Sequence, residues 1–175
     1  MKRATIPLAV ALAGIAGPAL AAMTLTSPDI RPGGPIAAAQ IYPRCGGGNV
    51  SPALSWSGAP AATRSLVLTM IDGDVKPAGW SHWIVVDLPP KSTGLPRGVK
   101  TLPGAAAAVA GNFGEAAYAG PCPPKGSGPH HYRFTLWAMP SASTTIPPNA
   151  RATGVAADLA HQALASASFV GVVER

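Results

Sequence analysis

SLVLTMIDGDVKPAGWSHWIVVDLP, residues 65–89, contains two short apolar runs on either side of a turn-forming segment. The runs, residues 65–71 and 83–88, are rich in β-branched and aromatic side chains, which favour strands. Both runs are nearly continuous in apolar character, as expected of strands that are covered on both faces. The stretch therefore predicts two central strands of a β-sheet.

A third strand is predicted from YRFTLWAM, residues 132–139. Its alternation is imperfect, but side chains two positions apart on a strand share a face. This places Tyr132, Phe134, Leu136 and Ala138 on one face of the sheet.

The C-terminal part of the chain follows a different pattern. Residues 153–168, TGVAADLAHQALASAS, are alanine-rich with apolar residues at helical spacing, and Thr153 is suited to cap the start of a helix. FVGVVER, residues 169–175, then predicts a last strand, whereas residues 105–108 are expected to form a loop. We expect one domain with a mostly antiparallel sheet and a peripheral helix.

The N-terminal residues have the layout of a secretory signal peptide. Lys2 and Arg3 precede the apolar residues 6–17, and Ala19-Leu20-Ala21 is a small-x-small cleavage site. We expect residues 1–21 to be removed and residues 22–175 to form a single periplasmic or secreted domain. The alternative is an uncleaved membrane anchor, although the apolar run is shorter than the roughly 20 residues of a span.

The charge of the chain argues against nucleic acid as a partner. The sequence holds 13 Lys and Arg against 7 Asp and Glu, and loss of Lys2 and Arg3 leaves 11 − 7 = +4. The remaining basic residues are scattered singly, without the stripe that a nucleic-acid footprint requires.

Only two cysteines, Cys45 and Cys122, occur in the chain, and each lies beside Gly or Pro in an expected loop. An oxidising compartment favours a disulfide between them. Two free thiols are the alternative.

Polar side chains lie where the two central strands meet the segment between them. Asp72 and Asp74 follow the first run, and His82 precedes the second. Strand alternation places His82 on the face of Ile84 and Val86. Taken alone, Asp-Gly-Asp is more often a turn than a site.

A second polar group stands at the start of the third strand, in GPHHYRF. By alternation His130 and Tyr132 can point into one pocket while His131 points away. Two carboxylates, two imidazoles and a phenol thus fall at strand ends beside Gly- and Pro-rich loops, and this convergence favours a binding site.

These residues carry a resemblance to a known family. The stretch 65–89, together with GNFGEAAYAGPCPPKGSGPHHYRFTLWAM at 111–139, resembles the two signature blocks of the phosphatidylethanolamine-binding protein (PEBP) family, in its bacterial Raf-kinase-inhibitor-like branch. NVSPALSW at 49–56 and FVGVVER at 169–175 resemble that branch too. The resemblance implies a mainly β PEBP-like fold with a large central antiparallel sheet, a smaller second sheet and an anion pocket at one end.

The resemblance also assigns ligand-binding positions. Three positions depart from the family: Gly73 stands where Pro is usual, Lys76 replaces a Pro that follows one place later, and His131 replaces a basic residue. Matched by motif, the ligand-binding positions are Asp72, Asp74, His82, Gly120, Pro121, His130 and Tyr132.

The predicted function is that of a non-enzymatic binding protein for a small anionic or phosphorylated ligand, with a lipid head group as one form of it. A buried anion needs donors that replace its lost water, and His82 is expected to be one. No cofactor is expected, and the sequence identifies no protein partner.

Two other classes of function remain open at this stage. A metal ion could be held by Asp72, Asp74, His82 and His130, although no compact ligand spacing is present. A hydrolase or lyase could use a His/Asp pair, with His82 or His130 as the base, but no Ser or Cys lies in a G-x-S-x-G nucleophile elbow.

Overall fold

The computed structural model describes residues 22–147, 150 and 152–175. The predicted signal peptide, residues 1–21, lies outside this part of the chain. The interpretation of residues 22–175 as a single domain stays a prediction. Among the described residues, no helix combines the length and the apolar composition needed to cross a bilayer.

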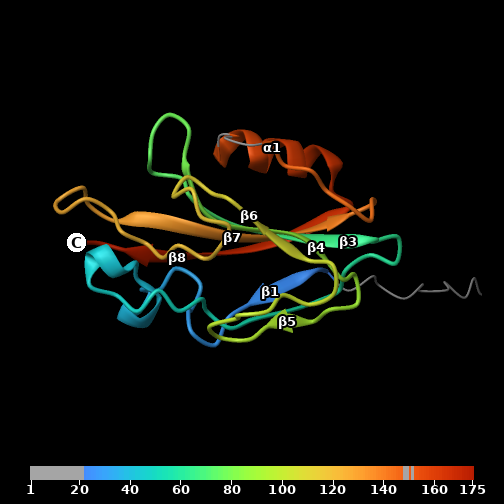
Figure 1. Cartoon of the computed structure of the whole chain (residues 1–175), viewed down its shortest axis with the longest axis horizontal. Helices are drawn as coiled ribbons and strands as arrows, with labels where there is room; N and C mark the ends of the chain where they lie inside the picture. Colours follow the sequence, from blue (N-terminus) through green and yellow to red (C-terminus); the bar gives the residue numbers. More distant parts are fainter. Residues whose placement is uncertain (1–21, 148–149, 151) are drawn as a thin grey trace, which may run out of the picture.

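The structure is mainly β, with two antiparallel sheets and one α-helix, as the sequence predicts (Figure 1). Helix α1 lies over one face of the large sheet and the small sheet lies against the other (Figure 1). The large sheet has the strand order β6-β4-β3-β7-β8 and consists of β6 (Ala107–Val109), β4 (Trp80–Leu88), β3 (Ser65–Asp72), β7 (His130–Met139) and β8 (Ala165–Val173). The small sheet has the order β1-β2-β5 and consists of β1 (Thr24–Thr26), β2 (Leu54–Ser57) and β5 (Gly94–Leu95). The helices are α1 (Ala152–Gln162) and the short 3-10 helices η1 (Ala38–Gln40) and η2 (Pro43–Cys45).

Strands β3 and β4 are central and almost entirely buried, as predicted, because the large sheet has a core on each face. Toward α1, Val155 and Leu159 of the helix pack with Val67, Ile84 and Trp137 of the sheet. The core between the two sheets includes Leu66, Leu68, Met70, Tyr132, Phe134, Leu136 and Ala138. The predicted shared face of β7 is therefore confirmed.

A β-bulge interrupts the pairing of β3 with β4 near the end of the sheet. Met70 lies opposite Trp83, but the next residue, Ile71, lies opposite Ser81. His82 is thus the additional residue of β4, without a Cα partner on β3. A bulge of this kind breaks the strict alternation of faces and redirects a side chain.

The predicted helix over residues 153–168 begins within one residue of α1 but extends too far at its C-terminal end. Helix α1 ends at Gln162, and β8 begins at Ala165 and pairs with β7 over its whole length. Alanine-rich sequence favours a helix only weakly, and sheet pairing overrides that preference here. At the other end, Thr153 lies inside the first turn and not at the N-cap position, so the predicted cap is wrong; its backbone N–H donates to the carbonyl oxygen of Ala78 at 3.0 Å.

The loop predicted for residues 105–108 is corrected as well. Its second half enters β6, where Ala107 pairs with Val86 and Ala108 with Val85. Alanine gives little strand signal on its own, so the edge position beside β4 decides the conformation.

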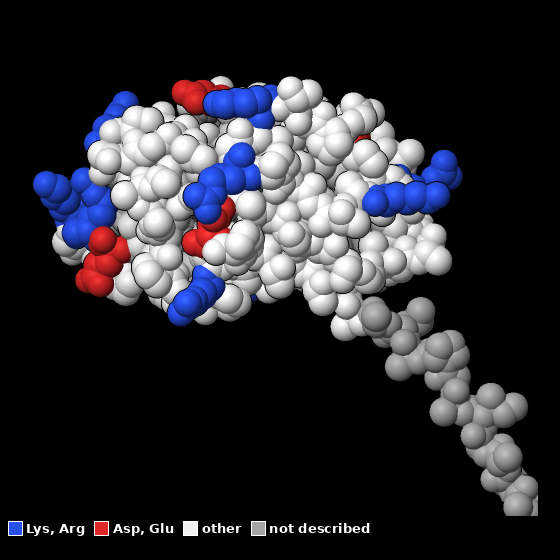
Figure 2. Space-filling model, turned by 90° about the horizontal axis from the view of Figure 1, so that it is seen from below, with Lys and Arg blue, Asp and Glu red and all other residues white. Residues whose placement is uncertain are grey.

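Lys and Arg side chains form no continuous basic patch on the face of the molecule that is seen from below. Figure 2 shows Lys and Arg side chains in small separate groups on this face, some of them beside Asp or Glu, with uncharged surface between the groups. The view agrees with the scattered basic residues of the sequence.

Candidate ligand-binding site

A pocket of about 370 Å³ opens where β3 ends and where β4 and β7 begin. Its walls are completed by η2 and by two loops, one at Phe113 and one at residues 122–124. The lining residues are Tyr42, Arg44, Asp72, Val75, Trp80, His82, Phe113, Cys122, Pro123, Pro124, His130 and Tyr132. Four of the predicted site residues thus meet in one pocket: Asp72, His82, His130 and Tyr132.

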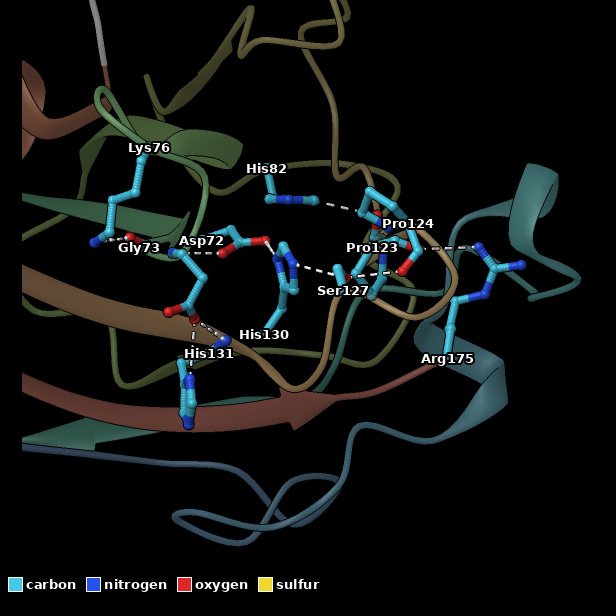
Figure 3. A network of polar contacts seen from close by, with 12 residues as sticks. Asp72, Gly73, Lys76, His82, Pro123, Pro124, Ser127, His130, His131 and Arg175 are labelled. Carbon is cyan, nitrogen blue, oxygen red and sulfur yellow. Dashed lines mark hydrogen bonds and ion pairs between the residues drawn. The ribbon is translucent and has the colours of Figure 1, made fainter.

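Asp72 and His130 form a buried pair at this pocket (Figure 3). The His130 Nδ1 atom lies 2.6 Å from Asp72 Oδ2, so a carboxylate there accepts the Nδ1 hydrogen. The other ring nitrogen, Nε2, lies 3.1 Å from Ser127 Oγ. Asp72 thereby fixes the orientation of the imidazole and directs Nε2 toward the loop that carries Ser127.

His82 reaches the pocket because of the bulge in β4. Its side chain lines the pocket, whereas Ile84 and Val86 belong to the core beneath α1, so the predicted shared face of these three residues is wrong. The Nδ1 atom of His82 lies 2.9 Å from the carbonyl oxygen of Ala119 and 3.2 Å from that of Gly120. Since carbonyl oxygens only accept, Nδ1 carries a hydrogen.

Burial lowers the pKa of His82, and the carbonyl contacts from Ala119 and Gly120 oppose this shift without reversing it. The neutral ring with its hydrogen on Nδ1 leaves a lone pair on Nε2. At neutral pH, His82 therefore offers an acceptor through Nε2, and it becomes a donor there only on taking up a proton.

The pH dependence of folding should report this arrangement. Because the pKa of His82 is lower in the folded state, the unfolded chain binds the proton more readily. Stability from keeping His82 neutral is present above the unfolded value of about 6.5 and is lost as pH falls below it. Urea unfolding of wild type and His82→Gln between about pH 8 and pH 5 measures how much more stability the wild type loses on acidification. Parallel stability curves for the two proteins would contradict the prediction.

The phenol of Tyr132 completes the floor of the pocket. Tyr132 is fully buried, and its ring meets that of His82 edge-on with centroids 5.0 Å apart. Its hydroxyl oxygen has no hydrogen-bond partner among the described residues. Burial raises the pKa of Tyr132, and the nearby Asp72 charge adds to the effect, so the hydroxyl keeps its hydrogen. A buried polar group without a partner costs about 1–3 kcal/mol, which a ligand that pairs with it can recover.

Gly120 and Pro121 support the pocket from behind and are not among its lining residues. The Gly120 N–H donates to Asn49 Oδ1 at 2.8 Å, and the carbonyl oxygen of Pro121 accepts from the N–H of Tyr42 at 3.0 Å. A Cβ at Gly120 would overlap the carbonyl oxygen of Gln40. These contacts fix the loop against the segment that carries Tyr42.

Asp74 is the predicted site residue that lies elsewhere. Its Oδ2 accepts from the backbone N–H of His131 at 2.7 Å and lies 2.9 Å from His131 Nδ1. Both residues line a second cavity of about 360 Å³ with Trp137 and Ala156 of α1, on the helix side of the sheet. The alternation that sends His131 away from His130 is therefore confirmed.

The separation of Asp74 from the pocket also bears on the metal alternative. Its proposed ligand set included Asp74, which the sheet holds on the opposite face from His82. No cluster of three or more His, Cys, Asp or Glu side chains suited to a metal ion occurs within residues 22–147, 150 and 152–175. Lys76, one of the three departures from the family, is not among the lining residues; it donates to the carbonyl oxygen of Gly73 at 2.9 Å and is exposed.

The predicted disulfide is present and joins two walls of the pocket. Cys45 in η2 is bonded to Cys122, with their Cα atoms 5.5 Å apart. The exposed Arg44, which precedes Cys45, and Pro123, which follows Cys122, both line the pocket. The C-terminal Arg175 donates to the carbonyl oxygen of Pro123 at 3.1 Å (Figure 3).

Sequence reasoning missed Arg44 and the aromatic wall. Phe113 contacts Tyr42 with ring centroids 4.7 Å apart, and it lies near Trp80 and His82 at 5.7 and 5.3 Å. Arg44 could have been found, because it precedes a cysteine expected to pair with the GPCPPKG loop. No local signal in the sequence marks Phe113 as a neighbour of Tyr42.

Two packed antiparallel sheets with a small pocket of paired ionisable groups at one end define a mainly β small-ligand-binding protein. Residues 26–174 match the family model described as phosphatidylethanolamine-binding protein. The chain belongs to this family.

Two relatives match this chain over most of their length. UPF0098 protein YbcL of Escherichia coli K12 is 36% identical over 162 residues, which cover 88% of each chain. LppC of Mycobacterium tuberculosis H37Rv, whose name classes it with lipoproteins, is 38% identical over 157 residues, covering 90% of this chain and 75% of LppC.

Solved structures agree as well. The crystal structure of E. coli YbcL, described as a new member of the mammalian PEBP family, superposes with a TM-score of 0.81 at 35% identity and covers 89% of this chain and 99% of YbcL. The PEBP homologue CT736 of Chlamydia trachomatis gives a TM-score of 0.71 at 30% identity, covering 88% of this chain and 98% of CT736.

Proposed function

We propose that the protein is an exported binding protein whose pocket takes a small anionic or phosphorylated group, either free or as the head group of a lipid. The observation that carries the proposal is the buried Tyr132 hydroxyl without a partner, next to the Asp72–His130 pair. A phosphate oxygen can accept from this hydroxyl. Arg44 at the rim supplies a positive charge toward the pocket opening.

His82 makes the proposed binding depend on pH. In its neutral form Nε2 accepts a hydrogen, so it pairs with the protonated oxygen of a phosphate monoanion. Alternatively a dianion draws a proton onto Nε2 and receives a charge-assisted hydrogen bond. Both routes add a proton to the complex, so affinity should rise as pH falls through the range near 6.5.

Calorimetric titration tests the proposal with inorganic phosphate and phosphoethanolamine at two pH values. We expect Tyr132→Phe, His82→Ala and His130→Ala each to weaken binding by roughly 1.5 to 3 kcal/mol, about ten- to a hundredfold. His131→Ala is the matched control, because His131 points to the other side of the sheet. Equal dissociation constants for all five proteins, or binding lost only on adding a chelator, would refute an anion pocket.

The proposed location is the periplasm or the extracellular space, after cleavage following Ala21. The n-region, the apolar segment and the cleavage site of residues 1–21 support it, and a disulfide suits an oxidising compartment. The lipoprotein name of LppC is compatible with export in a relative. Mass spectrometry of the protein from the extracytoplasmic fraction gives the N-terminus, and retention of Met1 would contradict cleavage.

A further inference from the structure

Ser127 extends the Asp72–His130 pair into a chain of three groups (Figure 3). Asp72 Oδ2 lies 2.6 Å from Nδ1 of His130, and Nε2 of the same ring lies 3.1 Å from Ser127 Oγ. The carboxylate and the imidazole are buried, whereas Ser127 is exposed. A hydroxyl within reach of a base that a third group orients is the arrangement of an activated nucleophile.

The hydrogen of the Ser127 hydroxyl has two acceptors within reach. Oγ lies 2.8 Å from the carbonyl oxygen of Pro124 and 3.1 Å from His130 Nε2. With Nδ1–H donating to Asp72, the neutral ring presents an acceptor lone pair at Nε2. Rotation of the hydroxyl from Pro124 to His130 therefore places its hydrogen on the base.

The loop displays Ser127 between two glycines, in GSG. Gly126 and Gly128 have φ angles of 75° and 80°, a conformation that favours glycine, so the chain turns sharply on either side of Ser127. The N–H of Gly128 donates to no acceptor within the described part of the chain. In serine hydrolases with a sharp nucleophile turn, the N–H of the residue after the nucleophile stabilises the oxyanion.

We propose that Ser127 and His130 act as nucleophile and base, with Asp72 as the positioning residue, in the cleavage of small carboxylic esters. Ser127 Oγ attacks the ester carbonyl while Nε2 of His130 takes the hydroxyl proton. The ester C–O bond breaks, and the leaving alcohol receives that proton. Water, deprotonated by the same Nε2, then attacks the acyl-serine. The bond between the acyl group and Oγ breaks, the acid leaves, and Ser127 Oγ takes the proton back from His130.

The adjoining pocket defines the class of ester. His130 and Pro124 belong to its lining, so the pocket adjoins the Ser127 loop. Its volume is about 370 Å³ and its aromatic wall includes Trp80 and Phe113, which fits an ester with a small apolar or aromatic group. This activity goes beyond the proposed anion binding and does not depend on it.

Labelling with a fluorophosphonate tests the proposal directly, because the reagent reacts with an activated serine and not with an ordinary hydroxyl. We expect the purified wild-type protein to gain one adduct, which peptide mapping places on Ser127. The protein should also hydrolyse p-nitrophenyl acetate. Ser127→Ala should form no adduct and should hydrolyse the ester at least about tenfold more slowly, since removal of a nucleophile abolishes its covalent route.

Ser92 provides a matched control. Its hydroxyl makes the same local bond, donating to the carbonyl oxygen of Pro89 three residues earlier at 2.6 Å, and it has no histidine partner among the described residues. Ser92→Ala should therefore behave as wild type, and His130→Gln should label at least about tenfold more slowly. No adduct on Ser127, equal labelling of His130→Gln, or hydrolysis that persists in Ser127→Ala would overturn the proposal. Phosphate titration of Ser127→Ala separates the two proposals, since anion binding should survive there.

Discussion

Replacing both Cys45 and Cys122 with alanine is expected to lower the free energy of unfolding by about 4 kcal/mol. The two residues are 77 positions apart, and a bridge across a loop of that length removes much conformational entropy from the unfolded chain. Urea unfolding of the oxidised wild type and of the double variant measures the difference. The same loss should appear when the wild type is reduced.

The bridge is also expected to hold two walls of the pocket together. Arg44 precedes Cys45, and Pro123 follows Cys122, so the bond joins two lining segments directly. Without it, the contacts of Tyr42 with Pro121 and Phe113 remain, and we expect the fold to persist. A stability difference below about 1 kcal/mol would mean that other contacts already restrict the unfolded chain.

Much of the fold could be predicted from the sequence, because local periodicity determines it. The central strands β3 and β4 and the face of β7 follow from apolar runs and alternation, which act over a few residues. The pairing of Cys45 with Cys122 follows from composition and compartment. The grouping of Asp72, His130 and Tyr132 is expected from their positions at strand ends and from the family resemblance, and the pairing of β3 with β7 produces it by placing Asp72 opposite Tyr132.

The rest depends on contacts between distant segments. The bulge at His82 arises from the register between two strands, which no pattern within one strand contains. Residues 165–168 favour a helix by composition but pair with β7. The Asp-Gly-Asp segment looks like one group in the sequence, yet β3 ends at Asp72, and the turn that follows places Asp74 on the opposite side of the sheet.

Asp72→Ala is expected to lower the free energy of unfolding by about 3–5 kcal/mol, because it breaks a buried pair. Asp72 Oδ2 accepts from His130, and its Oδ1 accepts from the backbone N–H of Asp74 at 2.9 Å. Both side chains of the pair are at least nine-tenths buried, with exposures of 3% and 8%. Removing the carboxylate leaves His130 without its acceptor in a place that water hardly reaches.

Asp74→Ala is the matched control, because it removes the same chemical group two residues away. The side chains of Asp74 and His131 are 39% and 54% exposed, so solvent can replace their contact. A pair of this kind contributes about 0–1 kcal/mol, and the loss of stability in Asp74→Ala should stay in that range.

Asp72→Asn separates charge from shape, since an amide oxygen still accepts one hydrogen bond from His130 but carries no charge. Urea unfolding of the three variants at pH 7 compares them under one condition. Equal losses for Asp72→Ala and Asp74→Ala would mean that burial does not strengthen the Asp72–His130 pair, and the pocket would then lack the rigid centre on which both its proposed binding and its proposed chemistry depend.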